Sequence, residues 1–138
     1  MEKKVLNINN HFFTYILDDN KVIRYIKDEY IDSKLNMLIT CEYGDSYLNN
    51  DALKLFGNIS NSNLFIEKTI LKDINTNNDK SIIRLIDKDN NIINEVYFIN
   101  DKININKNDN SLNNYHVPID IKNLYGMNLS INKNNIKK

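Results

Sequence analysis

The sequence predicts a mainly β protein, an antiparallel β-sandwich or distorted β-barrel of about seven to nine strands with one short α-helix. Apolar residues alternate with polar residues in several segments, which is the period of a β-strand. Clusters of Asn and Asp separate these segments, and both residue types tolerate the positive φ of tight turns. Several segments carry apolar residues on both faces, which favours closure over an open one-layer sheet.

The first half of the chain predicts a short strand, a hairpin, a longer strand and the helix. Residues 5–8 form the short strand, and HFFTYIL and KVIRYIK form a hairpin around Asp18–Asn20. With Asp19–Asn20 as a two-residue loop, Tyr15 faces Arg24 and Phe13 faces Ile26. The strand that follows places five residues on one face: Leu35, Met37, Ile39, Cys41 and Tyr43. The pattern then changes to a helical period at Asn49–Phe56, and Gly57 suits the residue after a helix end.

The second half predicts further strands around a central hairpin. Residues 64–74 are rich in β-branched types, which favours a strand over the alternative of a helix. The central hairpin, residues 81–100, allows two registers: an Asn90–Asn91 loop pairs Leu85 with Val96, whereas an Asp89–Asn90 loop pairs Arg84 with Glu95. Residues 102–108, KININKN, predict a polar edge strand, residues 127–131 a last strand, and residues 133–138 a frayed tail.

Length and charge point to one domain, residues 1–138, that needs no disulfide or metal to bury a core. Lys plus Arg and Asp plus Glu both number 18, so the net charge is zero. The chain therefore has no overall positive charge to attract the phosphates of a nucleic acid. The single Cys41, the lack of an apolar leader and the polar interruption of every apolar run predict a cytoplasmic protein without membrane contact.

Residues with catalytic potential are few, so we predict no metal and no other cofactor. The two histidines, His11 and His116, are far apart in the chain, and a structural metal needs clustered ligands. Cys41 lies on an apolar strand face, where a thiol is usually a buried core residue. The three glycines are isolated from one another and cannot form a phosphate-binding loop.

One constellation suggests binding. Phe13 and Tyr15 together with Arg24, Tyr25 and Lys27 resemble the rings and cations of a strand platform for single-stranded nucleic acid. The stronger interpretation places alternating aromatic residues in the core.

By elimination, we expect a small non-catalytic binding protein, of the inhibitor or immunity-factor type, that binds a protein partner through an exposed aromatic patch. The candidate binding residues are Tyr25, Tyr30, Tyr43, Tyr47, Tyr115 and Arg24. A small-ligand-binding sandwich or barrel is the first alternative, and a single-stranded nucleic-acid binder or an uncharacterised enzyme is the next. A homodimer that forms through KININKN or the last strand is a further alternative.

Overall fold

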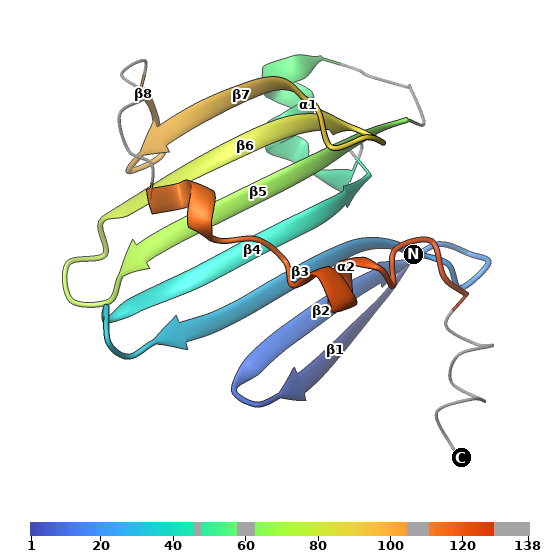
Figure 1. Ribbon diagram of the computed structural model, residues 1–138, viewed down its shortest axis with the longest axis horizontal. Helices are drawn as coiled ribbons and strands as arrows, with labels where there is room; N and C mark the ends of the chain where they lie inside the picture. Colours follow the sequence, from blue (N-terminus) through green and yellow to red (C-terminus); the bar gives the residue numbers. More distant parts are fainter. Residues whose placement is uncertain (46–47, 58–62, 105–110, 129–138) are drawn as a thin grey trace.

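The computed structural model describes residues 1–45, 48–57, 63–104 and 111–128. Its eight strands are antiparallel and form one sheet in which each strand pairs with its neighbours in chain order (Figure 1). The strands are β1 (Glu2–Ile8), β2 (His11–Leu17), β3 (Ile23–Asp32), β4 (Met37–Asp45), β5 (Leu64–Asp73), β6 (Asp79–Asp87), β7 (Ile92–Ile99) and β8 (Lys102–Asn104). The predicted mainly β, antiparallel fold is confirmed, with β1 and β8 at the edges of the described sheet.

The helices lie on opposite faces of the sheet. The predicted helix is confirmed as α1 (Asn50–Phe56), which begins where the Asn49 side chain accepts a hydrogen bond from the Ala52 backbone N–H at 2.9 Å. A second helix of one turn, α2 (Ile119–Lys122), follows a 3-10 turn, η2 (Ser111–Asn114). Figure 1 shows α1 behind the sheet and the segment with η2 and α2 in front of it.

The front face of the sheet is covered by residues 111–128, which we call the strap. Leu112 and Val117 of the strap are buried against a core that the alternating strand residues form. The sheet residues of this core include Phe13, Tyr15, Ile39, Cys41, Tyr43, Leu71 and Ile82. The strap explains the apolar residues on this face without a second sheet.

The back face is covered by α1 at one end only. Ala52 of α1 packs in a cluster with Ile66, Ile83 and Leu85. Gly44 lies on the same face, and an added Cβ there would come within 2.7 Å of the neighbouring strand backbone and ring of Tyr25. The tyrosine ring thus occupies the space that a side chain at Gly44 would need.

The central hairpin adopts the second of its two registers. Arg84 pairs with Glu95, as in the register predicted for an Asp89–Asn90 loop. A bulge after Leu85 then pairs Ile86 with Ile92 instead of Ile93. The strand interpretation of residues 64–74 is also confirmed, by β5.

The predicted register of the first hairpin is wrong. Tyr15 pairs with Ile26, and Phe13 pairs with Asp28, each two residues beyond the predicted partner. The cause is a longer loop, because the Asp18 carboxylate accepts hydrogen bonds from the backbone N–H groups of Asn20 and Val22. Because Asp18 organises a longer loop, the pair next to the loop is Leu17 with Ile23.

In the turns, Asn and Asp adopt the positive φ values that glycine adopts most easily. Of the eight non-glycine residues with positive φ in the described chain, six are asparagines, including the adjacent pair Asn9 and Asn10 between β1 and β2. Asp87 repeats the role of Asp18, since its carboxylate accepts from the N–H groups of Asp89 and Asn91. The high Asn content therefore reflects turn geometry in part.

The remaining expectations lie at the ends of the chain. The predicted first strand is confirmed as β1, and the edge strand is confirmed for Lys102–Asn104, the described part of KININKN. Asn128 forms an isolated bridge with Val22, whereas residues 129–131 of the predicted last strand and the tail at 133–138 lie outside the described residues.

We expect Asp87 to support stability only while it is ionised. The backbone N–H of Asn91 lowers the pKa of the Asp87 carboxyl in the folded state. A lowered folded pKa gives a stabilisation that is present above the unfolded pKa and is lost as the pH falls through the folded value. Asp87→Asn keeps an oxygen acceptor but cannot titrate. Its free energy of unfolding, measured in urea from about pH 6 to pH 2, should therefore fall less steeply than that of the wild type.

The matched control is Asp89→Asn, which removes the same charge from the same turn. It should keep the wild-type pH dependence. Identical pH dependence for the wild type and Asp87→Asn would contradict the proposed role of the turn carboxylate.

Candidate functional site

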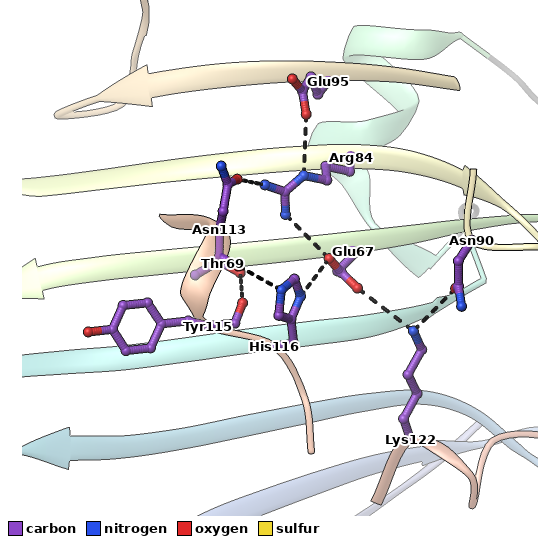
Figure 2. A network of polar contacts seen from close by, with 9 residues as sticks. All are labelled: Glu67, Thr69, Arg84, Asn90, Glu95, Asn113, Tyr115, His116 and Lys122. Carbon is purple, nitrogen blue, oxygen red and sulfur yellow. Dashed lines mark hydrogen bonds and ion pairs between the residues drawn. The ribbon is translucent and has the colours of Figure 1, made fainter. Parts of the chain in front are cut away.

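A row of charged side chains crosses the front face beneath the strap (Figure 2). Strand pairing places Glu67 of β5, Arg84 of β6 and Glu95 of β7 side by side. The guanidinium donates through Nη1 to Glu67 and through Nε to Glu95, each at 3.3 Å. Arg84 is only 4% exposed, so its charge depends on these carboxylates for compensation.

The strap adds Asn113 and His116 to this row. The Asn113 side-chain oxygen accepts a hydrogen bond from Nη2 of Arg84. His116 lies with Nδ1 3.0 Å from Oε1 of Glu67 and Nε2 2.8 Å from the carbonyl oxygen of Asn113. Both partners are acceptors, so the two contacts are satisfied together only when both ring nitrogens carry hydrogen.

Lys122 of α2 completes the network from the other side of Glu67. Its Nζ lies 3.8 Å from Oε2 of Glu67 and 3.5 Å from Oδ1 of Asn90 in the β6–β7 turn. The same ammonium stands 4.4 Å from the centre of the Tyr43 ring, a cation–π contact. The strap is thus fixed to β5 and β6 by charge as well as by apolar packing.

A pocket of about 380 Å³ opens between the strap and the front face. We call it the strap pocket. Its floor and walls are formed by Glu67, Arg84, Ile86, Asn90, Ile92, Asn113, His116 and Lys122.

A second polar pair lies on the front face at β2 and β3. Nδ1 of His11 donates to Oδ1 of Asp28 at 2.9 Å, and the His11 ring stacks on Tyr30 with centroids 4.2 Å apart. Asp28 is 1% exposed, and its Oδ2 has no hydrogen-bond partner among the described residues. Burial raises the pKa of the Asp28 carboxyl, and the neighbouring His11 opposes that rise.

This pair resembles the orienting half of an acid–base arrangement, but the described surroundings favour a structural role. Cys41 is the cross-strand neighbour of Asp28, and burial raises the pKa of its thiol to about 12. A thiol in that state is protonated at neutral pH and is a poor nucleophile. The two histidines do not act as a pair, because His11 contacts Asp28 and His116 contacts Glu67.

The predicted binding residues are divided between the two faces. Tyr25 is buried on the back face, where its hydroxyl donates to Glu42 and accepts from Asn49. Burial, reinforced by Glu42, raises the pKa of Tyr25. The half-exposed Arg24 forms an ion pair with Asp18 at 3.1 Å.

The other described tyrosines face the front core. Tyr43 is buried, and Tyr30 and Tyr115 are half-buried. The backbone carbonyl of Tyr115 accepts a hydrogen bond from the Thr69 hydroxyl (Figure 2). Tyr47 lies outside the described residues. The tyrosines described here therefore do not gather in one exposed patch.

The aromatic and basic constellation of the first hairpin is also split. Phe13 and Tyr15 are buried beneath the strap, whereas Tyr25 and Lys27 belong to the back face. Because the rings and cations are divided between the two faces, they do not make a common stacking platform.

The residues of the strap pocket were not predicted as a site. Glu67 and His116 lie 49 positions apart, and no local motif connects them. The Arg84–Glu95 pair was available from one of the two hairpin registers. The sequence offered no prediction of where the strap lies on the sheet.

Neither helix of the described chain is long and apolar enough to cross a membrane. The same residues contain no group of three or more His, Cys, Asp or Glu side chains arranged to hold a metal ion. Comparison with protein-family models, curated proteins and solved structures finds no match to this chain. The functional conclusion therefore depends on the residues and geometry described above.

We expect the loss of the His11 imidazole to destabilise the fold more at neutral than at acidic pH. His11→Phe keeps a ring for stacking but leaves the buried Asp28 carboxylate without a partner, at a cost of about 1–3 kcal/mol at pH 7. Because the pKa of Asp28 is raised, protonation at about pH 4 relieves part of this cost. Urea unfolding at both pH values measures the difference.

The double variant His11→Phe/Asp28→Asn serves as control, because it has no carboxylate to protonate. Its stability loss should not diminish at low pH. An equal cost of His11→Phe at both pH values would show that the Asp28 charge does not depend on His11.

Proposed function

We propose that this protein is a small non-catalytic binding protein, of the inhibitor or immunity-factor type, that binds a protein partner through the open part of its back face. The observation that carries the proposal is a set of apolar side chains on β1–β5 beyond the end that α1 covers. We call this set the back-face patch: Val5, Phe12, Ile31, Leu38 and Ile70.

Strand pairing makes the back-face patch continuous. Ile31 is directly opposite Leu38, and Phe12, opposite Glu29, is the diagonal neighbour of Ile31. Thr40, which pairs with Ile70, extends the patch onto β5. Diagonal neighbours on a sheet face are within reach of aromatic and long aliphatic side chains.

Exposure distinguishes the back-face patch from an ordinary sheet face. Val5 is 63% exposed, Phe12 48% and Ile31 62%. A cluster of large apolar side chains open to water is typical of an interaction surface. Phe12 provides the kind of aromatic anchor that dominates binding energy at protein interfaces.

The surroundings of the back-face patch support a protein partner. Glu29, Lys27 and Lys72 lie on the same face and provide polar groups of both signs around an apolar centre. A cytoplasmic location belongs to the same proposal, because the single cysteine is a free, buried thiol.

The proposal is tested by combining Phe12→Lys with Ile31→Lys. The matched control combines Ile103→Lys with Ile119→Lys, two exposed positions outside the back-face patch. Affinity capture from cells of the source organism should recover the same protein with the wild type and the control. The patch variant should recover at least about tenfold less of it.

Circular dichroism and thermal unfolding establish that both double variants fold. Equal recovery by the patch variant would contradict docking on the back face. Wild-type protein that binds only small metabolites would contradict the protein-binding function itself.

A further inference from the structure

We propose that the strap pocket binds a small organic anion that carries a carboxylate or a phosphate group. The site is on the face opposite the back-face patch, so it is a second function and not part of protein docking. Its volume of about 380 Å³ lies within the range of small-molecule sites.

The charges that line the strap pocket favour an anion. Two permanent cations, Arg84 and Lys122, and one histidine, His116, face a single lining carboxylate, Glu67. The Glu67 carboxylate already contacts Arg84, His116 and Lys122. A cationic ligand would therefore meet positive charge without a carboxylate to itself.

Lys122 is the group best placed to receive the anion. Charge-assisted N–H···O contacts are usually about 2.7–2.9 Å long, whereas its two oxygen contacts are 3.5 and 3.8 Å. The side chain is largely shielded from water, and shielding strengthens attraction to an opposite charge. An ammonium with three donors and only long oxygen contacts has capacity for a ligand oxygen.

Further donors surround the same space. Arg84 directs three of its five N–H groups to Glu95, Glu67 and Asn113, which leaves guanidinium donors beyond those contacts. The Asn90 side chain, at the mouth of the pocket, offers an amide N–H₂ group in addition to the oxygen that faces Lys122. Figure 2 shows these side chains reaching the network from the sheet, the strap and the β6–β7 turn.

The apolar lining limits the body of the ligand. Ile86 forms part of the lining and is buried, and Ile92, next to the turn, is exposed. A short aliphatic or similarly small group attached to the anion would contact both. The geometry therefore points to a small molecule with one anionic end and one apolar end.

Isothermal titration and thermal unfolding test the proposal with two probes, inorganic phosphate and 3-methylbutanoate, against sodium chloride at equal ionic strength. The wild type should bind at least one probe saturably below about 10 mM and gain melting temperature with its concentration. Binding of only one probe identifies the anionic group. Lys122→Met should weaken that binding at least about tenfold. Lys34→Met, in the β3–β4 turn at the other end of the sheet, should leave it unchanged.

Amide spectra of the wild type give a second measurement that does not require the variant to fold. Probe addition should shift the signals of Asn90, Asn113 and His116 first. No saturable binding of either probe, a response equal to that of chloride, unchanged affinity in folded Lys122→Met, or shifts confined to other regions would each overturn the proposal.

Discussion

Packing of the strap against the front face is the interaction on which the rest of the structure depends. A one-layer sheet has two faces to shield from water, and in the described chain α1 covers only one end of the back face. The strap places Leu112, 1% exposed, and Val117 among the front-face side chains. Because burial of apolar area is the main favourable contribution to folding, this contact gives the sheet a core.

The same packing creates the charged site. Once the strap crosses β5 and β6, His116 and Lys122 lie on either side of Glu67, and Asn113 meets Arg84. A buried arginine adds little stability by itself, but an unpaired one is costly. The network therefore favours one position of the strap over others. Because α1 covers only one end of the back face, the back-face patch stays exposed, and the two proposed functions occupy opposite faces.

Local patterns in the sequence predict the strands and α1 but only part of their assembly. Alternation in β4 and the helical period ending at Gly57 are signals between near neighbours, and both expectations are confirmed. The register of β2 and β3 depends on how Asp18 folds its loop, which residue types alone do not determine. The site depends on contacts such as Glu67 with His116, whose spacing carries no periodic signal. Apolar residues on both faces predicted a closed structure, whereas here the strap and α1 provide the cover.

Unfolding of Leu112→Ala in urea tests the central role of the strap most directly. Leu112 is buried, whereas Ile119 on the same strap is 69% exposed, so Ile119→Ala is the matched comparison. Leu112→Ala should lower the free energy of unfolding by about 2–4 kcal/mol. Ile119→Ala should change it by no more than about 0.5 kcal/mol. A Leu112→Ala variant as stable as the wild type would contradict the account, because the sheet would then be stable without the strap in its core.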